Sequence, residues 1–465
     1  MSGRGEGQLD LRPVPGAERG ARLFEALGAV CSGDRLWVDG DGEPERLYMA
    51  LLESGYKFSL AERATDRWRL RVDGADYHPQ GMGVGLHSLV VDPAAPWLVA
   101  CDRRDALFAI DSAHGSVGLR VNVGGAPSHV AMHPQGTSVA VANFAQGSVL
   151  HVHLDDLLAA GLPADGADAT SAALPGPGVV HSLPIGCGPH LPAFSADGRF
   201  VCATGTVSGD VAVIDVEGER VVDVLPVGHE PHDPIFSPDG ERVFVAVSGQ
   251  SEVAVVALPP RGRSGRRGRP KVAGRIAVGR GPSHLAWTPD GARLVVANAY
   301  DASVSVLCAD ATEACGYRLE GRVAAGRGAH VPEVTADGAL LVVANFLDDT
   351  LSLIELATGR TRATVPVGPY PHSFGLSPDG RLAVVACWGG EESYIVSLAD
   401  GRVAGTVPTG PGSSHVAFSP SGAVAYVTSS LADTISVVDL AQQRVIRTVM
   451  GGRPLPPRKA ACGPA

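Results

Sequence analysis

The chain has 465 residues, of which 45% are hydrophobic and 19% are charged, and its formal net charge is -11. These proportions indicate a folded globular protein, and 59 glycines with 35 prolines indicate many turns. The acidic balance argues against a nucleic-acid partner, which requires clustered Lys and Arg; we interpret the basic run at 261–270 as a solvated loop. No apolar stretch has the length of a membrane span or the character of a signal peptide, so we expect a cytoplasmic protein with no membrane partner.

The first part of the chain differs from the rest and predicts a small α+β domain over 9–75, after a disordered N-terminus over 1–8. The segments "LDLRPV" and "DRLWVDGD" predict strands, and "YKFSLAERATDRWRLRVDG" predicts a hairpin. Two helices are expected between them, the first with apolar residues at Leu23, Phe24, Leu27 and Val30 and the second in "EPERLYMALLESG". The "LDLRPV…R…FEAL" opening resembles the TusA-like domain of unknown function. TusA sulfur carriers have a Cys-Pro motif where this chain reads "LRPVPGAERG", so we expect no sulfur relay.

From residue 76 the chain repeats a phrase that contains a histidine. The copies place histidines at His87, His129, His190, His232, His284, His330, His372 and His415. Most intervals are close to 42 residues, the period of a propeller blade, and insertions lengthen two of them to 61 and 52. We therefore predict a mainly β fold, an eight-bladed β-propeller over 76–453, followed by a disordered tail over 454–465.

Each repeat contains the signals of a four-stranded blade. In one copy, "SHLAWTP" predicts the first strand, "DG" a turn, and "ARLVVANA" and "SVSVLCA" the next two strands; "RVIRTVMGG" is an example of the fourth. Radial closure of such blades protects the edges of their sheets. The phrases "LVVAN" and "AYVTSS" after "SPDG" resemble YVTN-type propellers, a likeness that implies the fold and leaves the activity open.

The histidines begin the innermost strands, so we expect the imidazoles to gather at one end of the central channel. Their distance to the "PDG" glycine differs by one residue among the copies, and a one-residue shift reverses the face of a strand. We therefore predict as metal ligands the set His87, His190, His232, His330 and His372. We expect His129, His284 and His415 to be displaced from that set.

The second strand of each repeat ends near the same place with a residue that is usually polar. We predict that these residues orient the imidazoles from behind, as metal-site histidines require: Cys101, Asn143, Thr204, Asn298, Asn345, Cys387 and Ser429. Plain buried cysteines are the alternative interpretation of Cys101 and Cys387.

Clustered imidazoles without thiolates or carboxylates suit copper, iron, haem iron or zinc, and no HExxH, P-loop, GxSxG or Rossmann motif offers another chemical centre. The "PH…PDG" phrase resembles strand openings in nitrous oxide reductase, which implies copper on the five favoured histidines. Phrases such as "VGHEPH" and the eight repeats resemble the haem-binding propeller of cytochrome-type nitrite reductase, which implies one or two histidines at a haem. We favour copper, with haem or iron as the other possibilities.

The prediction from sequence is thus a metal-dependent oxidoreductase that acts on a small, nitrogen-oxide-like molecule. It has neither a cytochrome c nor a cupredoxin domain, so a separate partner would deliver electrons. Two alternatives stay open. One is a non-catalytic interaction scaffold, whose histidines were copied by duplication and only cap the loops between blades. The other is a non-redox lyase, similar to streptogramin lyase, with a histidine as general base.

Overall fold

The computed structural model describes residues 6–14, 22, 23, 26, 35–41, 57–63, 67–73, 86–92, 97–111, 117–155, 180–259 and 268–451. The chain divides into two compact units, Met1–Val84 and Gly85–Ala465, and each is described by itself. No helix among these residues is long and apolar enough to cross a membrane.

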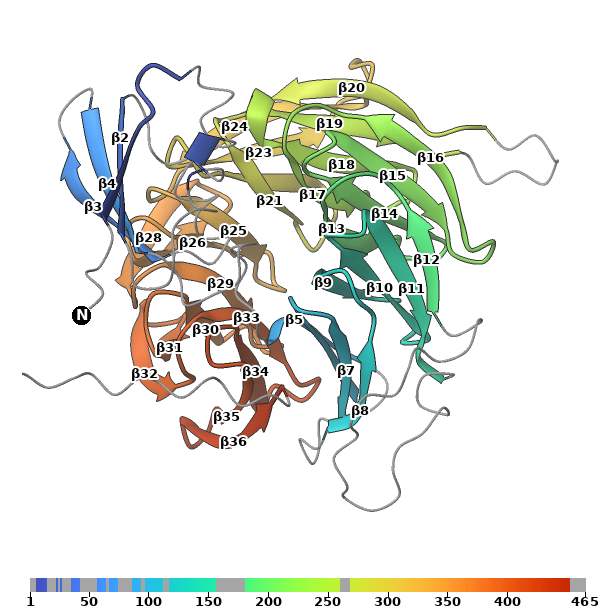
Figure 1. Ribbon diagram of the computed structural model, residues 1–465. Helices are drawn as coiled ribbons and strands as arrows, with labels where there is room; N and C mark the ends of the chain where they lie inside the picture. The colour runs from blue at the N-terminus through green and yellow to red at the C-terminus, as the bar shows by residue number, and fades with distance from the viewer. Residues whose placement is uncertain are drawn as a thin grey trace, which may run out of the picture. The chain divides into compact units, whose positions relative to one another are not determined.

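The first unit contains a four-stranded sheet in the order β1-β2-β4-β3 (Figure 1). Its strands are β1 (Glu6–Asp10), β2 (Arg35–Asp41), β3 (Lys57–Arg63) and β4 (Arg67–Asp73). Alternation buries Val38 and Leu70, and the predicted strands and hairpin are confirmed. Because β1 begins at Glu6, the expected disorder is wrong for residues 6–8, while 1–5 lie outside the described residues. Arg22, Leu23 and Ala26 are helical; the rest of both predicted helices and the tail at 454–465 also lie outside them.

The second unit is a succession of eight four-stranded antiparallel sheets, each made of consecutive strands. The first four sheets contain β5 (Leu86–Val91), β6 (Trp97–Asp102), β7 (Ala106–Asp111), β8 (Val117–Asn122); β9 (Pro127–Met132), β10 (Ser138–Asn143), β11 (Ser148–His153), β12 (Val180–Pro184); β13 (Pro189–Phe194), β14 (Phe200–Gly205), β15 (Asp210–Asp215), β16 (Arg220–Pro226); and β17 (Pro231–Phe236), β18 (Arg242–Val247), β19 (Glu252–Ala257), β20 (Lys271–Ala277). A short 3-10 helix, η2 (Ser248–Gln250), joins β18 to β19.

The last four sheets contain β21 (Pro282–Trp287), β22 (Arg293–Asn298), β23 (Ser303–Ala309), β24 (Tyr317–Ala324); β25 (Ala329–Val334), β26 (Leu340–Asn345), β27 (Thr350–Glu355), β28 (Arg360–Pro366); β29 (Pro371–Leu376), β30 (Leu382–Cys387), β31 (Glu392–Ser397), β32 (Arg402–Pro408); and β33 (Ser413–Phe418), β34 (Val424–Ser429), β35 (Thr434–Asp439), β36 (Arg444–Met450). Within this unit the sheets follow one another like the blades of a propeller (Figure 1). The prediction of a mainly β propeller is confirmed, and the described residues supply eight such sheets.

The "SPDG" phrase forms the turn between the first two strands of a sheet. At Ser377 the hydroxyl donates to Asp379 Oδ1 over 2.6 Å and accepts from the Leu382 amide over 2.9 Å. Gly380 then adopts φ 69°, a left-handed conformation that glycine takes without a steric penalty. This local chemistry fixes the length of each hairpin, and with it the place where the histidine begins the innermost strand.

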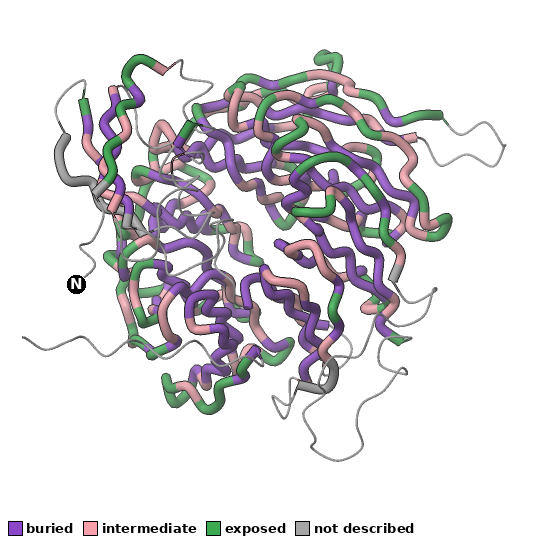
Figure 2. The backbone as a smooth tube through the Cα atoms, in the orientation of Figure 1, coloured by how far each residue is buried: buried purple, intermediate pink, exposed green. Residues whose placement is uncertain are grey.

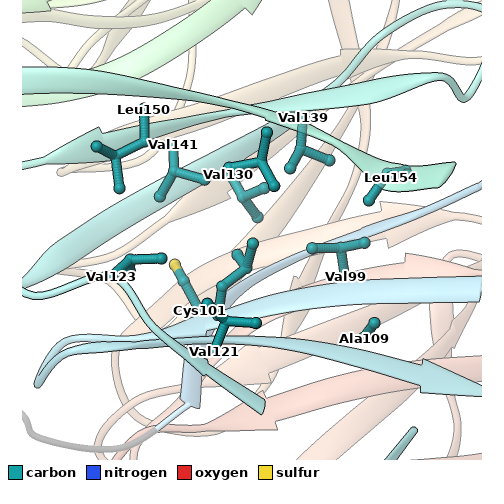
Figure 3. Packing of buried hydrophobic residues seen from close by; sticks show 12 residues of the cluster. Val99, Cys101, Ala109, Val121, Val123, Val130, Val139, Val141, Leu150 and Leu154 are labelled. Carbon is teal, nitrogen blue, oxygen red and sulfur yellow. The ribbon is translucent and has the colours of Figure 1, made fainter. Parts of the chain in front are cut away.

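The core of the propeller lies between neighbouring sheets. Val99 and Val121 of the first sheet pack with Val139, Val141 and Leu150 of the second, as Figure 3 shows. The middle strands are buried on both faces and are rich in valine, whereas the outer strands alternate between exposed and covered residues (Figure 2). The hydrophobic burial between sheets therefore holds the unit together.

The last sheet packs against the first and closes the circle. Leu86 and Phe108 share a core with Tyr426 and Ile435, and Asp433 Oδ1 accepts a hydrogen bond from the Leu86 amide at 3.1 Å. Closure therefore relies on packing and on side-chain hydrogen bonds, including those from Ser414 and Thr428 to the His87 carbonyl oxygen, since each of the two sheets consists of its own consecutive strands.

Candidate metal centre

All eight predicted histidines lie at the starts of the innermost strands, where the pairing register shifts. In β13, Pro189 pairs with Gly205 and Pro192 with Ala203, so β13 has one extra residue around His190. Shifts at the same place occur in the other innermost strands. A bulge breaks the regular alternation of side chains. Histidines in the second and in the third strand position can therefore turn toward the same centre.

The imidazoles form a closed ring, which we call the axial ring. The distances between the centroids of successive rings are 5.3 Å (His87–His129), 4.5 Å (His129–His190), 4.7 Å (His190–His232), 4.8 Å (His232–His284), 4.7 Å (His284–His330), 5.4 Å (His330–His372), 5.7 Å (His372–His415) and 5.0 Å (His415–His87). The expected displacement of His129, His284 and His415 is therefore wrong. They do occupy a strand position one residue later than the others, but the bulge absorbs that offset.

In five of the sheets, the residue at the second strand position forms a hydrogen bond to the next sheet. His330 Nδ1 is 3.0 Å from the carbonyl oxygen of His372, and His372 Nδ1 is 3.1 Å from that of Ser414, so both nitrogens donate. Where the histidine stands in the third position, a serine occupies the second and makes the same link. Ser283 donates to the His330 carbonyl oxygen at 2.9 Å and Ser414 to that of His87 at 3.1 Å.

These links bear on the alternative that the histidines are only structural. Three sheets make the link with a serine, namely Ser128, Ser283 and Ser414, and each also keeps a histidine one residue later. The link alone therefore does not account for those histidines. Where histidine makes the link through Nδ1–H, its Nε2 carries the lone pair that a metal ion requires.

One side of the ring contains a buried cation. We call His87, His129 and His415, together with Arg103, the arginine half. Arg103 Nη2 is 2.9 Å from His87 Nε2; because a guanidinium only donates, this nitrogen accepts, and His87 Nδ1 donates to Ser430 Oγ at 3.1 Å. Burial, with Arg103 as the next cause, lowers the pKa of His87 well below its ordinary value. Burial and neighbouring imidazoles similarly lower the pKa of His129, and that of His415 to about 3.

Another part of the ring contains a carboxylate. We call His232, His284 and His330, together with Asp233, the aspartate half. Asp233 Oδ2 lies 3.4 Å from His284 Nδ1 and accepts the Leu285 amide at 3.0 Å. Burial raises the pKa of Asp233 to about 6, so the carboxyl is mostly ionised at neutral pH. A carboxylate behind an imidazole sets its tautomer and strengthens it as a metal ligand.

The residues present fit a transition-metal ion. In each half, the three histidines offer ligand nitrogens that lie within 4.8 Å of one another; one ion with bonds of about 2.0–2.1 Å would need them somewhat closer. Among the described residues of the ring, three buried nitrogens have no hydrogen-bond partner: His129 Nδ1 and His415 Nε2 of the arginine half, and His190 Nδ1, which belongs to neither half. The guanidinium opposes a cation in the arginine half, whereas the carboxylate favours one in the aspartate half.

The residues predicted to orient the imidazoles contact other groups instead. The amides of Asn143, Asn298 and Asn345 bind loop carbonyls or hydroxyls of their own sheets. Thr204 donates to the backbone oxygen of His232, and Ser429 to that of Thr409. These side chains therefore position backbone, and the prediction that they contact the rings is wrong.

The two cysteines of that predicted set are core residues. Cys101 and Cys387 are fully buried in apolar clusters, and burial raises the pKa of each thiol to about 12. Neither is a thiolate at neutral pH, which agrees with the alternative of plain buried cysteines. In addition, Leu86 pairs with Asp102 and not with Cys101, and Pro189 pairs with Gly205 and not with Thr204. The predicted alignment of the first and third repeats is therefore one residue early.

The side chains that do contact the ring come one residue after the end of the second strand. Arg103 and Ser430 bind His87. Trp388 lies 5.9 Å from His372 and Phe346 6.4 Å from His330, measured between ring centroids. The sequence indicates their position, which directly follows each "VVAN"-like run. It does not indicate their role, because the residue type at this position differs from one repeat to the next.

Two family models match the chain. Residues 8–73 match DUF2249, an uncharacterised conserved protein family, and this match leaves a relationship to TusA unconfirmed. Residues 202–387 and 319–451, together more than half of the chain, match the family described as lactonase, 7-bladed beta-propeller. That description gives seven blades, whereas the structure has eight sheets. A search of curated proteins found no match.

Solved structures share the fold at low sequence identity. Dihydro-heme d1 dehydrogenase NirN in complex with DHE is 17% identical with a TM-score of 0.58, covering 79% of this chain and 73% of that chain. Hydrazine synthase of Kuenenia stuttgartiensis is 20% identical (TM-score 0.49, 68% and 96% covered). A putative 6-phosphogluconolactonase of Bacteroides fragilis is 16% identical (TM-score 0.49, 68% and 92% covered). At these identities the likeness concerns the fold alone.

Proposed function

The chain belongs to the family described as lactonase, 7-bladed beta-propeller, and we propose that it binds a transition-metal ion on the imidazoles of its axial ring. The observation that carries this proposal is the aspartate half. There, His284 has a ring nitrogen 3.4 Å from the Asp233 carboxylate, and its ring lies between those of His232 and His330 at 4.8 and 4.7 Å. Three imidazoles backed by a carboxylate are a ligand set for copper, iron or zinc.

Each residue of this half has a separate role in the proposal. His232, His284 and His330 would hold the ion, and Asp233 would orient His284. The link from His330 Nδ1 to the His372 carbonyl fixes which nitrogen of His330 faces the ion. The remaining members of the ring, among them His190 and His372, would enclose the site, with Phe346 and Trp388 limiting water next to them.

The bound ion would supply redox chemistry if it is copper or iron, and Lewis acidity if it is zinc. The sequence favoured copper, but none of the related proteins adds support for copper over iron. A small-molecule substrate, a separate electron donor and a cytoplasmic location belong to the same proposal.

Haem is the second candidate, because one structural neighbour is a dihydro-heme d1 dehydrogenase. The centroids of neighbouring imidazoles in the ring are 4.5–5.7 Å apart, with six pairs edge to face and two tilted, so a macrocycle does not fit between neighbours. If haem bound here, an imidazole of the ring would hold its iron. The close packing of the rings makes a metal ion the better fit.

The test is metal binding by protein purified without a histidine tag. Titration with Cu²⁺ and with Fe²⁺ should load the wild type, and the double variant His232→Ala/His330→Ala should lose at least about a hundredfold in affinity, since it loses two direct ligands where the loss of an outer contact alone costs 10- to 100-fold. His229→Ala, which removes an exposed histidine of the neighbouring loop, is the matched control and should bind as the wild type does.

Each of three results would contradict the proposal and favour a different function. A Soret band on addition of haem, lost in the double variant, would favour haem. Hydrolysis of a sugar lactone by the metal-free protein would favour the activity named in the family's description. No metal binding and unchanged behaviour of the double variant would favour an interaction scaffold.

A further inference from the structure

A second group of histidines lies on the outer strands of the second sheet, outside the axial ring. His151 and His153 are two residues apart on β11, and therefore on one face of that strand. His181 of β12 pairs directly with His151. Glu219, in the turn between β15 and β16 of the third sheet, comes close to all three imidazoles. The group therefore joins two neighbouring sheets.

The distances place one carboxylate among three imidazoles. Glu219 Oε1 is 2.8 Å from His153 Nε2 and 3.7 Å from His151 Nδ1, and its Oε2 is 3.1 Å from His181 Nδ1. The ligand atoms of His151, His153 and Glu219 all lie within 4.8 Å of one another. The side chains of His153, His181 and Glu219 are 28–37% exposed, so an ion from solvent can reach the group.

His151 stands where the other sheets carry an apolar residue. The equivalent positions, identified by strand register, are Ala109, Val213, Val255, Val306, Leu353, Ile395 and Val437. His151 is only 3% exposed. Its Nε2 is 2.9 Å from Ser138 Oγ, but its Nδ1, which faces Glu219, has no hydrogen-bond partner. Burying such a nitrogen is unfavourable unless a ligand satisfies it.

Glu219 adopts φ 45°, a left-handed conformation that is disfavoured for a residue with a side chain. The equivalent residues of two other sheets are the glycines Gly359 and Gly401, at 69° and 65°, whereas that of the last sheet is Gln443, at 49°. The turn therefore accepts either kind of residue, and the group departs from the other repeats mainly at His151.

We propose that His151, His153, His181 and Glu219 bind a divalent ion of the zinc class and that this ion cross-links the second and third sheets. Three imidazoles and one carboxylate match the nitrogen and oxygen ligands that Zn²⁺ takes in a tetrahedral site. The ion would also hold together the ends of β11 and β12, which residues 154–179 connect, and closing a long connection stabilises a fold. This site is independent of the one proposed in the axial ring.

Zinc titration of the full, untagged chain tests the proposal, with two variants taken from the chain's own repeats. His151→Val introduces the aliphatic residue of the other sheets, and Glu219→Gly introduces the glycine found in two of the equivalent turns. Both should fold at least as stably as the parent protein without zinc. Because zinc also suits the axial ring, both changes are made in the His284→Ala background, which weakens that site. There, zinc should still raise the melting temperature, and each change should lower zinc affinity at this site at least tenfold and remove that rise.

Two outcomes would overturn the proposal: a His284→Ala protein whose melting temperature zinc does not raise, or a rise in that background that both His151→Val and Glu219→Gly retain. Loss in His284→Ala of a zinc stabilisation that the wild type shows would move the zinc effect to the axial ring. Failure of this site is therefore distinguishable from failure of the axial site.

Discussion

The arginine half and the aspartate half of the axial ring both lie at the starts of innermost strands and have the same ligand type, but their neighbouring charges are opposite. Each contains three histidines whose ligand nitrogens lie within 4.8 Å of one another. In one half, Arg103 binds His87 at 2.9 Å; in the other, Asp233 lies 3.4 Å from His284. A unit charge about 4 Å from a bound cation changes its free energy by about 4 kcal/mol per unit of charge at an effective dielectric constant of 20.

The difference shows how a repeat protein can make an asymmetric site. The repeat places a histidine at the start of every innermost strand, while residues that the repeat leaves variable set the local charge. Asp233 stands beside His232 in "PHDP", and Arg103 follows the end of β6. The site is therefore defined by the exceptions to the repeat as much as by the repeat itself.

The largest effect should come from removing the charge of Arg103. Arg103→Met should allow the arginine half to bind a second equivalent of metal, with a gain of at least about a hundredfold in affinity there, because the opposing guanidinium is lost. Isothermal titration calorimetry gives the stoichiometry. Arg381→Met, whose side chain is 82% exposed, is the control for a general loss of positive charge. If the stoichiometry stays unchanged in Arg103→Met, the charge does not distinguish the two halves.

Neutralising the Asp233 carboxylate should have the second largest effect. Asp233→Asn should weaken metal binding by about 10- to 100-fold, the range for loss of a group that orients a ligating histidine. Glu333→Gln is a matched control on another innermost strand: burial raises the pKa of Glu333 to about 8, so the carboxyl is mostly neutral at pH 7. Equal losses in the two variants would mean that Asp233 has no special role.

The metal-free protein should lose stability as the pH falls. The pKa of His415 is lowered to about 3 by burial, so the unfolded chain, with an ordinary pKa of about 6.5, binds more protons. Stability then decreases as pH falls from about 6.5 toward 3, by at most about 1.4 kcal/mol per pH unit for this residue. Denaturant unfolding at pH 7, 6 and 5 should show a shallower dependence for His415→Gln than for the wild type. Identical slopes would contradict the assigned burial.

The smallest effect should come from the cysteines. Cys387→Ser and Cys101→Ala should change metal affinity less than about twofold, since both thiols are protonated core groups with a pKa near 12. Absorption spectroscopy of the Cu²⁺-loaded protein provides the measurement. A thiolate-to-copper band that disappears in either variant would place a cysteine at the metal.

The fold and the ring of histidines were predictable because local chemistry repeats along the chain. The "SPDG" turns and the valine-rich strands predict where the hairpins lie, and the interval of about 42 residues predicts one sheet per repeat. The bulges were not predictable, since an extra residue in one strand is visible only once its partner is known; strict alternation therefore separated His284 from the other ligands wrongly. Contacts between residues distant in sequence were equally hidden: Arg103 binds His87 of its own sheet, and Glu219 approaches histidines of the preceding sheet. The sequence pattern does not connect either pair.

The most direct test compares two variants at the same strand position, His284→Ala and His129→Ala, by metal titration under identical conditions. Both histidines stand third in their innermost strand and have close neighbours in the ring. Since only His284 belongs to the aspartate half, its variant should lose at least about a hundredfold in affinity, while His129→Ala should stay within about threefold of the wild type. An equal loss in both, or a larger loss in His129→Ala, would contradict the assignment of the metal to the aspartate half.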